Sequence, residues 1–88
     1  MIAQEHFILT LENGTEIPVT MTLDESPAFH YGNHTCVIVE IEGEEDKLLD
    51  TRYEKEIASP ELFHEWSYNW LKETRRSTIT ITRILKGA

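Results

Sequence analysis

The chain has 88 residues, 40% of them hydrophobic, with sixteen acidic residues against eight Lys and Arg, which gives a formal net charge of −8. This composition is that of a globular protein and excludes a disordered chain, and the length suits one domain covering residues 1–88. The longest apolar run, residues 36–39, is too short for a membrane span or the core of a signal peptide, so we expect a cytoplasmic protein.

The first part of the chain has the pattern of a β-hairpin. Residues 5–12 and 15–23 each alternate apolar with polar side chains, as a strand with one buried face does. Asn13-Gly14 between them predicts a type I′ turn, in which both residues have a positive φ. Because Pro18 cannot donate to a ladder of hydrogen bonds, we expect the second strand to lie at an edge of the sheet or to carry a bulge.

The middle of the chain adds a loop and further strands. Residues 24–33 form the longest irregular stretch, and residues 34–42 alternate again and predict a third strand. The charged residues 43–46 then predict a turn. Residues 47–53 suit either a short fourth strand or an extended connection to a helix, and we favour the strand.

Residues 59–74 predict the one strong helix. Ser59 suits the N-cap and Pro60 the first helical position, where its missing N–H costs nothing. At 100° per residue, the apolar side chains fall within about 100° of arc, which is the width of a stripe facing a core. This stripe consists of Leu62, Phe63, Trp66 and Trp70.

A last strand is expected over residues 77–85, with Ile79 and Ile81 facing the core. The predicted fold is therefore α+β, a two-layer structure with a mostly antiparallel β-sheet in ββββαβ order and one amphipathic helix packed on one face. The opposite face of the sheet should be polar, with Thr10, Thr20, Thr22, Glu40, Glu42, Thr78 and Thr80.

Charge is divided unevenly along the chain. Residues 1–46 contain ten acids and no Lys or Arg, whereas all eight bases fall in residues 47–88. Alternate residues on one face of a strand lie roughly 6.5 to 7 Å apart, close to the phosphate spacing along one nucleic-acid strand. The densest acidic run could copy that spacing, or it could serve only to keep an exposed sheet soluble. This run contains Glu40, Glu42, Glu44, Glu45 and Asp46.

The chain is short, its first 46 residues contain no base, and it has an acidic run from Glu40 to Asp46. In these features it resembles the small acidic proteins of phages and mobile elements that inhibit host defence systems, anti-CRISPR proteins among them. The resemblance implies a non-enzymatic inhibitor that binds a basic, nucleic-acid-binding protein surface, such as a nuclease. We expect the acidic run to bind that surface and Phe29, Tyr31 and Tyr68 to serve as apolar anchors, without a cofactor.

Three alternatives remain. A patch of late bases, Arg75, Arg76, Arg83 and Lys86, suits direct nucleic-acid binding, although the net charge opposes it. His30, His34 and Cys36 have the spacing of metal ligands, but a structural zinc site needs a fourth ligand that is not apparent. A homodimer is a further alternative, because an open sheet has a free edge and because a second copy could bury the outward-facing side chains of Ile8 and Ile38.

Enzymatic activity is not expected. Cys36 lies between acidic stretches, where nothing lowers the pKa of a thiol, so we interpret it as a small structural side chain. The chain contains no glycine-rich phosphate loop and no hydrolase or metalloprotease motif.

Overall fold

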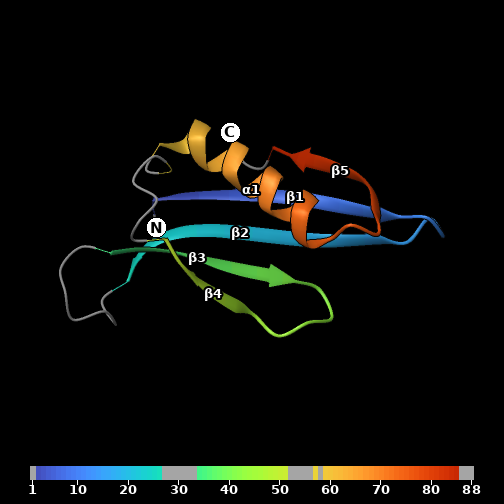
Figure 1. The fold of residues 1–88 in the computed structure, drawn as a ribbon, viewed down its shortest axis with the longest axis horizontal. Coiled ribbons are helices and arrows are strands. Elements are labelled where there is room, and N and C mark those ends of the chain that lie inside the picture. The colour runs from blue at the N-terminus through green and yellow to red at the C-terminus, as the bar shows by residue number, and fades with distance from the viewer. Residues whose placement is uncertain (1, 27–33, 52–56, 58, 86–88) are drawn as a thin grey trace.

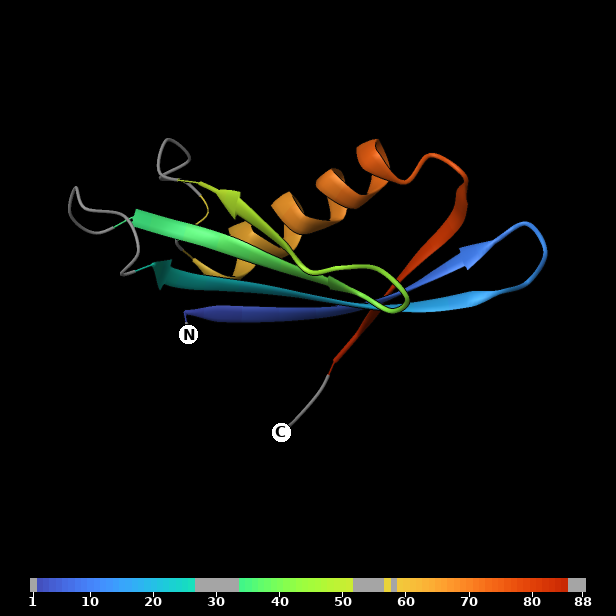
Figure 2. The same cartoon turned by 90° about the horizontal axis from the view of Figure 1, so that it is seen from below.

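The computed structural model describes residues 2–26, 34–51, 57 and 59–85. These residues form a five-stranded antiparallel sheet with one helix across one face (Figures 1 and 2), which confirms the predicted α+β fold and its ββββαβ order. The strand order is β4-β3-β2-β1-β5. The elements are β1 (Ala3–Leu11), β2 (Glu16–Ser26), β3 (His34–Ile41), β4 (Lys47–Asp50), α1 (Pro60–Thr74) and β5 (Thr78–Ile84).

The core lies between α1 and the face of the sheet that points toward it. Every second residue of β1, β2 and β3 contributes a buried side chain, as the period-2 alternation of the sequence predicts. The core consists of Phe7, Leu9, Val19, Met21, Leu23, Val37, Val39, Ile41, Ile57, Phe63 and Leu71. No helix in the described part of the chain is long and apolar enough to cross a membrane.

Helix α1 begins as predicted. The Ser59 hydroxyl accepts a hydrogen bond from the Leu62 N–H at 3.2 Å, and Pro60 occupies the first turn. The buried stripe differs from the prediction, because Phe63, Ser67 and Leu71 are fully buried while Leu62 is 46% exposed. Phe63, Ser67 and Leu71 are four residues apart, and residues at this spacing stay on nearly the same side of a helix. The buried stripe therefore follows these three residues and leaves Leu62 at its margin.

The β1–β2 turn is not of type I′. The Gly14 N–H donates to the Leu11 carbonyl at 3.0 Å, and the Leu11 N–H donates to the Thr15 carbonyl at 2.9 Å. Gly14 has a φ of 84°, whereas Asn13 keeps a negative φ and accepts the Thr15 N–H on its side-chain oxygen. The loop therefore has three residues, a type I turn followed by a glycine in the left-handed region.

Strand β2 lies inside the sheet, between β1 and β3, and its register with both neighbours has no shift, so the prediction of an edge position or a bulge was wrong. The Pro18 carbonyl accepts from the Glu42 N–H at 3.2 Å, just beyond the end of β3. In an antiparallel pair the missing Pro18 N–H would point to the same residue, Glu42, which lies just beyond the last residue of β3. Proline is therefore tolerated within a central strand at the position where its neighbour ends.

Strand β5 carries a bulge that the sequence did not reveal. Thr10 of β1 pairs with Thr80, whereas the next residue, Leu11, pairs with Thr78. This shift leaves Ile79 unpaired and 63% exposed, so the predicted inward orientation of Ile79 was wrong, and it places Thr78 opposite a core-facing position. Ile81 packs against the core as predicted.

Candidate functional site

Acidic side chains gather at one end of the sheet. The β1–β2 loop and the β3–β4 turn both lie at the end toward the right of Figure 1. The Glu42 N–H, just beyond β3, donates to the Pro18 carbonyl in β2. The carboxylates of this end come from segments far apart in the sequence, and all are exposed. We call them the acidic end: Glu12, Glu16, Glu40, Glu42, Glu44, Glu45 and Asp46.

Part of the acidic end belongs to the face of the sheet that points away from α1, which we call the open face. Glu40 pairs with Thr20 and Glu16 pairs with Thr10, and all four alternate with core residues, so they point away from the helix. Glu42 follows Glu40 by two residues, at the level of Pro18. Glu40 lies near the end of β3, and Glu42 lies in the turn that follows the strand.

Glu44 differs from its acidic neighbours because Arg75 binds it. The two terminal nitrogens of Arg75 donate to the two carboxylate oxygens of Glu44 at 2.8 and 2.7 Å. These hydrogen bonds hold the pKa of Glu44 below its ordinary value. The pair connects the β3–β4 turn to the C-terminal end of α1, so this carboxylate is already engaged within the molecule.

The described bases lie on the helix side of the sheet. Lys47 pairs with Val39 and Arg83 with Phe7, and both partners are core residues that point toward α1. The remaining bases come from the end of α1 and the connection to β5: Lys72, Arg75 and Arg76. Among the described residues, none of the open-face positions is Lys or Arg, whereas Glu16, Asp24, Glu40 and Asp50 all occupy such positions.

The open face also carries threonines and apolar side chains. Thr20 and Thr22 hold their neighbours on β1, since the Gln4 amide donates to Thr22 at 3.0 Å and the His6 ring lies 3.2 Å from the Thr20 hydroxyl. Around this polar centre lie half-buried or exposed apolar residues: Ile8, Pro18, Ile38, Leu48 and Ile84. No described element forms a second layer on this side of the sheet (Figure 2).

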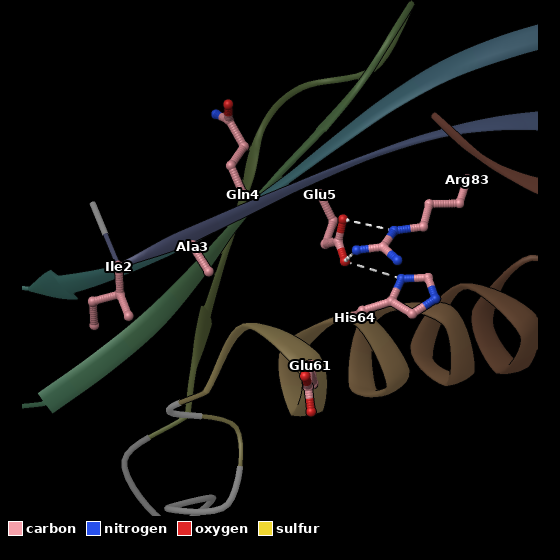
Figure 3. A pocket seen from close by; sticks show the side chains of 7 residues that line it. All are labelled: Ile2, Ala3, Gln4, Glu5, Glu61, His64 and Arg83. Carbon is pink, nitrogen blue, oxygen red and sulfur yellow. Dashed lines mark hydrogen bonds and ion pairs between the residues drawn. The ribbon is translucent and has the colours of Figure 1, made fainter. Parts of the chain in front are cut away.

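A second charged site lies between the start of β1 and α1. Glu5 is buried, and Arg83 donates to its two oxygens, from Nε at 3.2 Å and from a terminal nitrogen at 2.8 Å (Figure 3). His64 brings its Nδ1 within 3.0 Å of the same carboxylate. A pocket of about 290 Å³ adjoins these groups, lined by Ile2, Ala3, Gln4, Glu5, Glu61, His64 and Arg83.

The contact between His64 and Glu5 is an ion-pair distance without the alignment of a hydrogen bond. The ring instead stacks on Phe7, with centroids 5.8 Å apart and planes inclined by 15°. Packing against Phe7 therefore sets the orientation of the ring. We interpret Glu5, His64 and Arg83 as a clasp that joins β1, α1 and β5.

Sequence reasoning missed this clasp, although a signal was present. Glu5 stands two residues before Phe7 and therefore falls on the inward side of the alternation in β1. A carboxylate on an inward position requires a partner, because an unpaired charge away from water is costly. The sequence did not indicate which base would supply it.

The remaining predicted site residues are dispersed or undescribed. Tyr68 is 39% exposed on the outer side of α1, away from the open face. Phe29 and Tyr31, predicted as anchors, lie outside the described residues, as does Lys86 of the basic patch. Within that patch Arg75 and Arg83 are in ion pairs with Glu44 and Glu5.

The predicted metal cluster is only partly described. His30 and the side chain of His34 lie outside the described part of the structure, and Cys36 is buried. Within the described ranges, no group of three or more His, Cys, Asp or Glu side chains is arranged to hold a metal ion.

Comparison of the chain with models of known protein families, with curated proteins and with solved structures finds no match.

Proposed function

We propose that this protein is a non-enzymatic binding protein that presents its acidic end and open face to a basic protein surface. The observation that carries the proposal is that the two faces of the sheet differ in the sign of their charged side chains. The described open-face positions include Glu16 and Glu40 but no Lys or Arg, while the described bases occupy the helix side.

The chemistry of the partner follows from the spacing of the carboxylates. Glu40, near the end of β3, and Glu42, in the turn beyond it, are two residues apart, a separation that along a strand is close to the phosphate interval of nucleic acid. A protein groove that binds nucleic acid is therefore a complementary surface. A surface of one sign attracts such a partner over several ångströms and raises the association rate. By its resemblance to acidic anti-defence proteins, the chain would act as an inhibitor of a nuclease by occupying that groove.

The test begins with the tagged protein in its natural host, from which the bound protein is captured and identified. The affinity of that purified protein is then compared for the wild type and for Glu40→Lys/Glu42→Lys. We expect the double variant to lose about tenfold or more in affinity and most of the dependence on salt, because charges at the contact are reversed. DNA or RNA should compete with the wild type for the partner.

Glu61→Lys/Glu65→Lys is the matched control. It changes the net charge by the same amount on exposed positions of α1. We expect it to retain most of the affinity. An equal loss in both double variants would mean that only the net charge matters, and an unchanged affinity for Glu40→Lys/Glu42→Lys would refute the proposal.

A further inference from the structure

The open face contains two apolar patches. Ile8 on β1 pairs with Pro18 on one side and with Thr82 on the other, and Ile84 stands diagonally next to it on β5. On the other half of the sheet Ile38 pairs with Leu48, which is 57% exposed. These side chains lie on a polar, acidic face and take no part in the core between sheet and helix.

The polar residues between the two patches already make hydrogen-bonding contacts with each other. The Gln4 amide is hydrogen-bonded to Thr22, and the His6 ring is within hydrogen-bonding distance of Thr20. Removing water from a polar group is costly only when no partner replaces it. These contacts lower the desolvation penalty of covering the centre of the open face, and the cover buries apolar surface on both sides of it.

Charge selects the occupant. Two copies of this chain placed face to face would cover Glu16, Glu40 and Glu42 of each copy with a face on which the described residues include no Lys or Arg to pair with them, whichever way the strands of the two copies run. A second copy is thus disfavoured. A partner with apolar side chains flanked by Lys or Arg matches both the patches and the carboxylates beside them.

The size of the face agrees with this role. Five strands spaced about 4.8 Å apart, over about seven residues of 3.3 Å rise, cover on the order of 500 Å². A stable interface buries about 800 Å² on each partner. The open face therefore supplies the larger share of such an interface, and the adjoining turns of the acidic end could supply the rest.

We infer that the open face is the docking surface for a protein whose contact region has apolar side chains flanked by Lys or Arg, with Ile8 and Ile38 as anchors and Glu40 and Glu42 as the charged border. This inference rests on the proposed function and adds to it. The acidic end alone would bind any polycation, whereas the open face selects one that also carries apolar groups.

The experiment uses two synthetic peptides of equal length and charge, one alternating Lys with Val and the other alternating Lys with Ser. Binding to the full chain is followed by NMR through backbone amide shifts. We expect the Lys–Val peptide to bind about tenfold more tightly and to shift amides of Thr20 and Ile38. The double variant Ile8→Thr/Ile38→Thr should lose that preference while binding the Lys–Ser peptide as before.

Leu62→Thr/Ile79→Thr is the control, since both side chains are exposed and neither contributes to the open-face patches. It should keep the preference, and urea unfolding of each variant verifies the fold. Equal binding of both peptides, with shifts confined to residues 42–46, would overturn the inference and leave the proposed function standing. Binding of neither peptide would count against both. A dimer in sedimentation that Ile8→Thr/Ile38→Thr abolishes would identify a second copy as the occupant and overturn the inference.

Discussion

Glu5 shows what a single charged residue requires when it occupies a core-facing position. Its side chain is buried, and both oxygens accept hydrogen bonds from Arg83, which lies 78 positions away in the sequence. The charge is therefore neutralised within the molecule. Arg83 is 43% exposed, so solvent moderates the strength of the pair.

We predict that Glu5→Gln lowers the free energy of unfolding by about 1 to 3 kcal/mol, because the isosteric amide has no charge and only one oxygen to accept hydrogen bonds from the Arg83 guanidinium. Urea denaturation measures the change. Glu65→Gln on the exposed side of α1 is the control and should stay within about 0.5 kcal/mol of the wild type. A similar small effect for Glu5→Gln would show that the clasp contributes nothing to stability.

Glu44 provides a prediction about pH. Hydrogen bonds from Arg75 lower the pKa of its carboxyl in the folded state. The resulting stabilisation is fully present above the pKa of the unfolded chain and is lost as the pH falls through the lowered pKa of the folded state. NMR titration of the Glu44 side chain should therefore show a midpoint that Arg75→Gln moves upward.

Arg76→Gln is the matched control for this titration. The Arg76 side chain donates to the Glu73 carbonyl at 3.4 Å, and the Glu44 contacts come from Arg75. We expect the Glu44 midpoint to remain in place in this variant. A midpoint that is the same in wild type and Arg75→Gln would contradict the described ion pair.

At the scale of the element, the sequence predicts that α1 is an amphipathic helix but misplaces the centre of its buried stripe. The prediction centred the apolar stripe near Trp66, Trp70 and Leu62, because large apolar side chains contribute most to a hydrophobic pattern. In the structure, Trp66 and Trp70 only flank the core, while Phe63, Ser67 and Leu71 are fully buried. A small serine on the buried stripe allows close packing but gives no hydrophobic signal.

We predict that Leu71→Ala costs about 2 to 5 kcal/mol of stability, since it removes a fully buried side chain and leaves a cavity. Leu62→Ala, the same substitution on the same helix, should cost less than about 1 kcal/mol because Leu62 is 46% exposed and leaves no enclosed cavity. Thermal or urea unfolding compares the two. Equal costs would place the buried stripe where the sequence alone put it.

At the scale of the whole molecule, the order of the chain explains the division of charge. Residues 1–46 contribute β1, β2 and β3, the three inner strands, and contain no Lys or Arg. The bases arrive later, with the helix, its C-terminal connection and the flanking strands, and the described ones fall on the helix side. The proposed binding surface and its test with Glu40→Lys/Glu42→Lys belong to this scale, because the surface draws on several strands.

The sequence by itself determined the elements, the fold class and the inward faces of β1, β2 and β3. These follow from local periodicity, which a short stretch of chain carries in full. It also determined that acids precede bases. Only the tertiary structure decided which acids are engaged, since Glu5 with Arg83 and Glu44 with Arg75 are separated by 78 and 31 positions. It likewise decided the bulge at Ile79 and the interior place of β2, because strand order and register depend on the pairing of distant segments.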